Sequence, residues 1–229
     1  MHVDPATVRR RSAGVLAVLL LAVGALLAFA EIAGEVVEGD TRAFDAAVLL
    51  ALRTPADAAD PIGPPWVEAA FRDLTTLGGT SVLTVVTLAT LGYLLLAGKR
   101  ATAALVAVAV LGGTLLSSLL KAGFERPRPD LVAHLVEVSS QSFPSGHATL
   151  SAVTWLTLGT LLATVQSRRR LKAYVLGVAI AVTLLVGTSR VYLGVHWPTD
   201  VIAGWCIGTA WALLSWLAAR ALFRHGGAR

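Results

Sequence analysis

The sequence predicts an all-α, polytopic membrane protein in which one domain, residues 1–229, forms a six-helix transmembrane bundle. The chain is 55% hydrophobic and only 14% charged, and its mean hydropathy is +0.72. Soluble domains carry about 25% charged residues, so this composition indicates an integral membrane protein. Six charge-poor runs are long enough to span a bilayer, which takes about 20 residues per helix.

The six predicted spans cover residues 13–30, 74–98, 101–120, 146–165, 173–189 and 201–219. The first also has features of a secretory signal, because arginines precede it and Ala28-Phe29-Ala30 offers a small-residue cleavage site. Its apolar run is long for a signal, which favours a retained span. Cleavage would leave five spans in the same orientation.

The only long connection runs from Glu31 to Asp73. Within it, apolar residues recur at helical spacing from Phe44 to Leu52, and four prolines follow. This pattern predicts a short helix, which either lies along the membrane interface or packs on the bundle.

The distribution of Lys and Arg predicts the orientation. Twelve of the nineteen cations, but only one of the fourteen acids, lie in the N-terminus, the turn at Lys99-Arg100, the loop from Arg168 to Lys172 and the C-terminal tail. The positive-inside rule makes these segments cytoplasmic. The remaining loops then face outward at the cell membrane.

Composition also bears on partners and cofactors. The sequence pI is about 10, but the cations are dispersed at span ends rather than forming a basic stripe with aromatics, so we predict no nucleic-acid partner. The single cysteine, Cys206, lies in an apolar run and cannot form a disulfide framework or a cysteine-based metal site. No carboxylate cluster suits magnesium, so no metal and no cofactor are predicted.

Three polar clusters lie at the ends of predicted spans, where charged groups are costly and therefore indicate function. The first contains Lys121 and Arg128-Pro129. Taken alone, these could be interfacial cations that snorkel to the surface. Arg126-Pro127 supplies a competing Arg-Pro pair in the same loop.

The second cluster, Pro144-Ser145-Gly146-His147, directly precedes the fourth span. Ser145 is placed to cap that helix, and Gly146 lets the backbone approach a ligand closely. Free N–H groups at a helix N-terminus bind phosphate. A capped helix with an interfacial histidine is the simpler alternative.

The third cluster contains Ser189-Arg190, His196 and Asp200. Asp200 can accept a hydrogen bond from one nitrogen of His196, which leaves the other nitrogen free to attack. Arg190 offers a planar set of donors for phosphate oxygens. A plain capping pair of His196 and Asp200 is the alternative. In an up-down bundle, all three clusters reach the same outer level.

Together the clusters, Lys121-x6-Arg128-Pro129, Pro144-Ser145-Gly146-His147 and Ser189-Arg190-x5-His196-x3-Asp200, resemble the signature of the type 2 phosphatidic acid phosphatase superfamily. The resemblance implies a metal-independent phosphatase that forms a phosphohistidine. It implies that His196 is the nucleophile, that Asp200 orients it and that His147 is the acid for the leaving group. Phosphate would be held by the remaining signature residues: Lys121, Arg128, Ser145, Gly146 and Arg190.

A site at the membrane surface is most easily reached by a lipid whose phosphate lies in the headgroup layer. The predicted substrates are phosphatidate, phosphatidylglycerol phosphate, diacylglycerol pyrophosphate and polyprenyl pyrophosphate, and the sequence does not separate them. Two alternatives are a non-catalytic lipid-phosphate transporter or binding protein, and a sugar-phosphate phosphatase. The sequence leaves the oligomeric state open.

Overall fold

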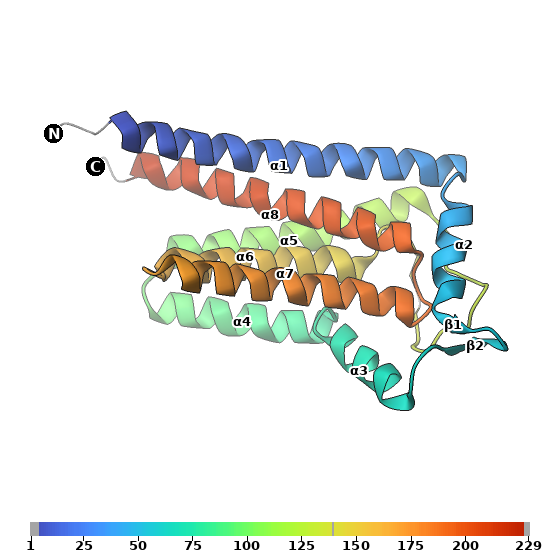
Figure 1. Ribbon diagram of the computed structural model, residues 1–229. Helices are drawn as coiled ribbons and strands as arrows, with labels where there is room; N and C mark the ends of the chain where they lie inside the picture. The colour runs from blue at the N-terminus through green and yellow to red at the C-terminus, as the bar shows by residue number, and fades with distance from the viewer. Residues whose placement is uncertain (1–4, 139, 227–229) are drawn as a thin grey trace.

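The computed structural model describes the backbone of residues 5–138 and 140–226, and it consists of long helices that run side by side (Figure 1). The long helices are α1 (Pro5–Glu38), α4 (Thr80–Leu96), α5 (Arg100–Phe124), α6 (Gly146–Val165), α7 (Arg169–Tyr192) and α8 (Pro198–Gly226). The shorter elements are α2 (Arg42–Ala51), β1 (Arg53–Thr54), β2 (Asp57–Pro61) and α3 (Pro65–Thr76). The all-α membrane class is therefore confirmed.

Five helices, α1 from Ser12 onward and α5 to α8, are long and apolar enough to cross a membrane. A sixth span is obtained if α3 and α4, which meet at a bend of 45°, count as one. The second span was predicted at residues 74–98; in the structure α3 ends at Thr76, and α4 begins at Thr80 after an extended Gly79. At this bend a Cβ on Gly78 would lie 2.2 Å from Val186 Cγ1, so the backbone approaches α7 closely. Helix α1 continues beyond the first predicted span, residues 13–30, to Glu38.

The connection between α1 and α3 crosses the end of the bundle that is remote from the chain termini (Figure 1). The helix expected there is α2, and it packs on the bundle. Leu49 of α2 is fully buried in an apolar cluster with Val132, Ala148 and Val201. The short β1–β2 hairpin that follows was not predicted.

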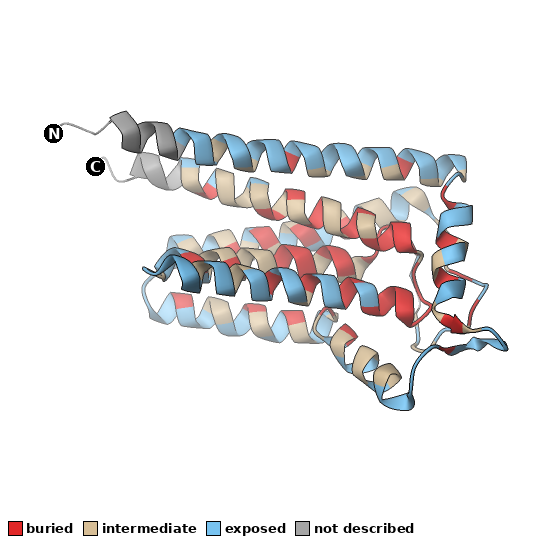
Figure 2. Ribbon diagram, in the orientation of Figure 1, coloured by how far each residue is buried: buried red, intermediate tan, exposed pale blue. Residues whose placement is uncertain are grey.

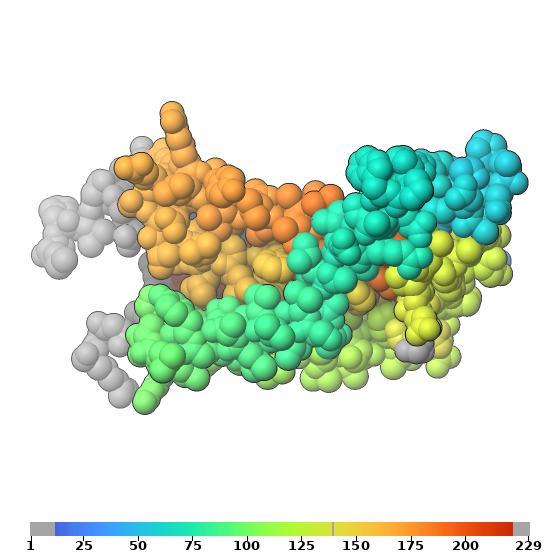
Figure 3. Space-filling view, turned by 90° about the horizontal axis from the view of Figure 1, so that it is seen from below, coloured from blue at the N-terminus to red at the C-terminus, as the bar shows by residue number. Residues whose placement is uncertain are grey.

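Helix α6 lies at the centre of the bundle and packs against α4, α5, α7 and α8. Between α4 and α7 a strip of α6 remains visible at the surface (Figure 3). Glycines of α8 allow α6 to approach, since a Cβ on Gly204 would lie 2.8 Å from Ser145 O and one on Gly208 would lie 2.5 Å from Thr149 O. Small residues permit such contacts between membrane helices. This packing brings Ser145 beside the start of α8, where its N–H donates to Asp200 O over 2.9 Å.

Two tryptophans of α8 lie against glycines of neighbouring helices. A Cβ on Gly187 of α7 would lie 2.4 Å from the Trp205 ring, and one on Gly112 of α5 would lie 2.4 Å from the Trp211 ring. Each indole N–H donates to a carbonyl of the helix it covers, which satisfies a polar group inside the bundle. Along α6, α7 and α8, buried residues become more frequent toward the end of the bundle that is remote from the chain termini (Figure 2). That end holds the polar clusters.

Candidate active site

A cavity of about 340 Å³ lies among the loop ends of α5, α6 and α7. Six of the eight predicted site residues line it: Lys121, Arg128, Gly146, His147, Arg190 and His196. The other two, Ser145 and Asp200, are fully buried and do not line it. The expectation that the three clusters meet at one level of the bundle is met by this arrangement.

The hydrogen bonds of His196 indicate its tautomer. Nε2 lies 3.3 Å from Arg128 Nη1, and Nδ1 lies 3.3 Å from Asp200 Oδ2. A guanidinium can only donate, so Nε2 accepts and the ring proton belongs on Nδ1, where Asp200 can accept it. The lone pair of Nε2 is therefore the one available at the cavity.

Burial also governs the charge of His196. Removal from water lowers the pKa of His196 to about 4, while the hydrogen bond and the charge of Asp200 oppose this shift by smaller amounts. A lowered pKa means that the imidazole is harder to protonate, so the ring is neutral above about pH 4. At pH 7 His196 therefore has the protonation state that a nucleophile requires.

Asp200 is held from both of its oxygens. Oδ2 accepts from the Ser142 hydroxyl and from Trp197 N–H, in addition to His196. Oδ1 accepts from Arg126 Nη1 at 2.6 Å. A buried carboxylate with this many donors is kept ionised and fixed in orientation.

Arg126 links Asp200 to a second buried carboxylate, Asp45 of α2. Arg126 Nη2 donates to Asp45 Oδ2 at 2.7 Å, and Asp45 also accepts from the backbone N–H and the hydroxyl of Thr199. Helix α2 is thereby tied to the start of α8 by a chain of charged hydrogen bonds. The two Arg-Pro pairs of the sequence thus differ in position. Arg128 lines the cavity, whereas Arg126 binds Oδ1 of Asp200, the oxygen that does not contact His196.

The three cations around the cavity are each anchored by neutral acceptors. Arg128 donates to Ser140 O and Val195 O, and Lys121 Nζ donates to Gln141 O at 2.6 Å. Arg190 Nη1 donates to the Thr75 hydroxyl at 2.9 Å, while its buried Nε has no partner among the described residues. Because none of these bonds neutralises the cations, their charge remains available to an anion in the cavity.

The second cluster has the local structure expected for it. Ser145 is the N-cap of α6, and its hydroxyl accepts from Ala148 N–H at 3.5 Å. Gly146 leaves room for the Lys121 side chain, since a Cβ there would lie 3.3 Å from Lys121 Cε and the lysine would have to shift. His147, in the first turn of α6, lines the cavity with Lys121 and Arg190. The Ser145 hydroxyl serves the helix cap, so its predicted contact with phosphate stays a prediction.

Four supporting residues were missed by the sequence analysis, Asp45, Thr75, Ser142 and Thr199, while Arg126 was considered only as an alternative to Arg128. For Asp45 a signal was present, because this carboxylate lies four residues before Leu49 on the apolar face of α2. An acid on such a face indicates a buried partner. Ser142, Thr75 and Thr199 carry no comparable signal, since single hydroxyls are common in loops and helices.

Comparison with known proteins gives one family. A sequence model of the PAP2 superfamily matches residues 101–224. Phosphatidylglycerophosphatase B of Bacillus subtilis is 36% identical over 151 residues, which are 64% of this chain and 72% of that protein. Undecaprenyl-diphosphatase of Sulfolobus acidocaldarius is 43% identical over 74 residues, 32% of each chain. The crystal structure of the first transmembrane PAP2 type phosphatidylglycerolphosphate phosphatase from Bacillus subtilis has a TM-score of 0.79 at 30% identity, covering 88% of this chain and 96% of that one.

Proposed function

Since this chain belongs to the PAP2 superfamily, we propose that it hydrolyses a lipid phosphate or pyrophosphate by way of a phosphohistidine, without a metal ion. The family resemblance drawn from the three motifs is confirmed by the comparisons. The observation that carries the proposal is the cavity in which three cations, none in an ion pair among the described residues, face a neutral, oriented imidazole.

We assign the first step to His196. Its Nε2 lone pair attacks phosphorus, a bond from nitrogen to phosphorus forms, and the bond from phosphorus to the leaving oxygen breaks. As the ring becomes positive, the Asp200 carboxylate stabilises it through Nδ1–H. Lys121, Arg128 and Arg190 neutralise the charge on the phosphoryl oxygens, which is the main requirement of phosphoryl transfer.

We assign proton transfer to His147. Partial burial and the surrounding cations oppose an imidazolium at His147, whereas a bound phosphate dianion offsets the charge of the cations and favours it. The protonated ring then donates to the leaving oxygen. In the second step the neutral ring takes a proton from water, water oxygen bonds to phosphorus, the nitrogen–phosphorus bond breaks and inorganic phosphate leaves.

The shape of the cavity supports a lipid substrate. Its lining continues from Lys121 to Thr114, about 10 Å along α5. Thr80 of α4 and Leu150 of α6 also line it, so the space extends from the loop level into the bundle. A phosphate at the loop level with chains directed between helices fits this path. The named relatives act on phosphatidylglycerophosphate and undecaprenyl diphosphate, which keeps both monoesters and pyrophosphates among the candidates.

The reaction is tested by phosphate release from detergent-purified protein. The panel should contain phosphatidate, phosphatidylglycerol phosphate, diacylglycerol pyrophosphate and polyprenyl pyrophosphate, with a soluble sugar phosphate for comparison. We expect phosphate release from at least one lipid. EDTA should leave this release nearly unchanged, because side-chain cations supply the positive charge, and vanadate should inhibit it. Activity that disappears on chelation and returns with magnesium would contradict the mechanism. Lipid binding without any release would instead favour the transporter or binding protein.

We further propose that the protein lies in the cell membrane with both termini in the cytoplasm and the catalytic cavity on the outer face. The bent α3–α4 pair then serves as the second of six spans. In Figure 1 the termini lie at one end of the bundle and the loops that carry the polar clusters lie at the other. The concentration of Lys and Arg at the terminal end supports a cytoplasmic location for it.

Thiol labelling of sealed cells tests this orientation. Asp130, in the loop after α5, and Arg169, the first residue of α7, are both exposed and lie at opposite ends of the bundle. In a Cys206→Ser background, Asp130→Cys should react with an impermeant reagent from outside, whereas Arg169→Cys should react only after the cells are opened. The reverse pattern would overturn the orientation and the substrate pool that it implies.

A further inference from the structure

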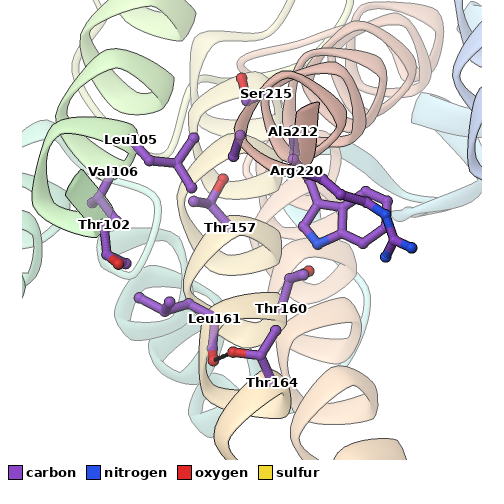
Figure 4. Close-up of a pocket in the computed structure, with 12 residues that line it drawn as sticks. Thr102, Leu105, Val106, Thr157, Thr160, Leu161, Thr164, Ala212, Ser215 and Arg220 are labelled. Carbon is purple, nitrogen blue, oxygen red and sulfur yellow. Dashed lines mark hydrogen bonds between the residues drawn. The ribbon is translucent and has the colours of Figure 1, made fainter. Parts of the chain in front are cut away.

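A second cavity lies between α5, α6 and α8, toward the end of the bundle that carries the termini (Figure 4). It measures about 310 Å³, and five hydroxyl-bearing residues line it: Thr102, Thr157, Thr160, Thr164 and Ser215. The hydroxyl of Thr157 is buried and has no hydrogen-bond partner among the described residues. Thr157 follows Gly146 by eleven residues, so it lies about 16 Å along α6 from the catalytic level. This cavity shares no lining residue with the candidate active site.

An apolar groove of about 900 Å³ adjoins that cavity on the side of α1 and α7. The groove forms because α1 packs mainly against α8 while α7 packs mainly against α6, which leaves a space between the two outer helices. Its lining on α7 runs from Lys172 to Leu184, the half of this helix that is remote from Arg190. The groove therefore extends from the middle of the bundle toward the end remote from the catalytic cavity.

Two cations lie toward the terminal end, one in the lining of the groove and the other in the lining of the adjoining cavity. Lys172 lines the groove directly. Arg220 stacks over Trp216 with its Cζ 5.3 Å from the ring centroid, and Trp216 lines both the groove and the hydroxyl-bearing cavity. Arg220 Nε is buried without a hydrogen-bond partner, and no carboxylate of the described residues forms an ion pair with either cation. The groove is thus lined mainly by apolar side chains, and positive charge from Lys172 and Arg220 lies at its terminal end.

We propose that this groove binds one anionic diacyl phospholipid from the leaflet at the terminal end of the bundle. The acyl chains fill the apolar space between α1 and α7, and the phosphate is the missing counter-ion of Lys172 and Arg220. Basic side chains at a membrane surface attract anionic lipids in this way. The neighbouring hydroxyl-bearing cavity supplies donors and acceptors to the polar headgroup. A zwitterionic lipid brings its own cation with its phosphate and leaves the net positive charge of Lys172 and Arg220 unneutralised, which is why net charge decides the occupant.

The charge requirement is tested by native mass spectrometry of detergent-purified protein offered equal amounts of phosphatidylglycerol and phosphatidylcholine. Saturating inorganic phosphate keeps the catalytic cavity occupied, so a retained lipid reports on the groove. We expect one phosphatidylglycerol per chain, and in the double variant Lys172→Gln/Arg220→Gln about 30-fold weaker retention. The control Lys99→Gln/Arg168→Gln removes the same charge at the same end of the bundle from exposed positions outside the groove, and it should retain the lipid. Equal retention of both lipids by the native protein would overturn the proposal.

A second variant tests the apolar part without altering charge. Gly24 lines the groove, and a Cβ there would meet no protein atom within 4 Å. Gly24→Leu should therefore fold, occupy the space of the acyl chains and reduce lipid retention while leaving phosphate release unchanged. Gly34→Leu is the matched control, because this glycine lies on the same helix, is equally unobstructed and is outside the groove. If Gly24→Leu and the charge variant both retain phosphatidylglycerol as the native protein does, the site does not exist.

Discussion

Replacement of His196 by alanine should abolish both phosphate release and the trapping of a phosphoenzyme. The substitution removes Nε2, which lies at the cavity, while Nδ1 of the same ring is held by the Asp200 carboxylate. Loss of an activated nucleophile in other hydrolases lowers turnover by about 10⁴-fold or more, and we expect a similar effect here. The measurement is acid-quenched labelling with radioactive phosphate substrate, together with steady-state release. Thermal unfolding of the variant should be recorded alongside, because His196 is buried.

His147→Ala is the comparison that separates the two imidazoles. A general acid contributes about 10²- to 10⁴-fold, and mainly where the leaving group is poor. The variant should therefore retain more activity toward an aryl phosphate than toward a lipid phosphate, and it should still form a phosphoenzyme. Equal losses on both substrates, or a phosphoenzyme in His196→Ala, would show that the roles are wrongly assigned.

Asp200→Asn should leave lipid binding intact but lower turnover by about 10⁴-fold, as expected when a histidine loses the carboxylate that selects its tautomer. Neither orientation of the asparagine amide fits the native contacts. With its NH₂ group at the Oδ2 position, it would face His196 Nδ1–H and Trp197 N–H, which are both donors. With its NH₂ group at the Oδ1 position, it would face the Arg126 guanidinium. The result to measure is a large fall in kcat with little change in KM.

Asp45→Asn is the matched control for that substitution. It also removes one buried carboxylate charge next to Arg126, but Asp45 does not contact His196. Its effect on turnover should be nearer 10- to 100-fold, as is typical for residues that support a functional side chain indirectly. If Asp45→Asn impaired turnover as severely as Asp200→Asn, the charge of the whole network would matter more than the contact between Asp200 and His196.

Much of the fold was predictable because membrane helices are defined locally. Residues 146–165 form an apolar run behind a serine cap, and α6 has these bounds. The bend before α4 was not predictable, since Gly78 and Gly79 interrupt no charge pattern and the bend depends on the close approach of Val186 from α7. The β1–β2 hairpin and the docking of α2 likewise depend on contacts with distant segments.

The sequence by itself determined the residue types of the site and the end of the bundle at which they lie, because apolar runs of spanning length and the polar clusters that end them are local properties. Only the tertiary structure decided what each arginine of the Arg-Pro-Arg-Pro segment does. Local spacing does not distinguish Arg126 from Arg128. The difference arises because two distant carboxylates, Asp45 and Asp200, bind Arg126 from 81 and 74 residues away in the chain, whereas Arg128 lines the cavity. The same holds for the groove beside Lys172, which exists because α1 and α7 pack against different helices. Such contacts join segments that are distant in the chain, so no local pattern records them.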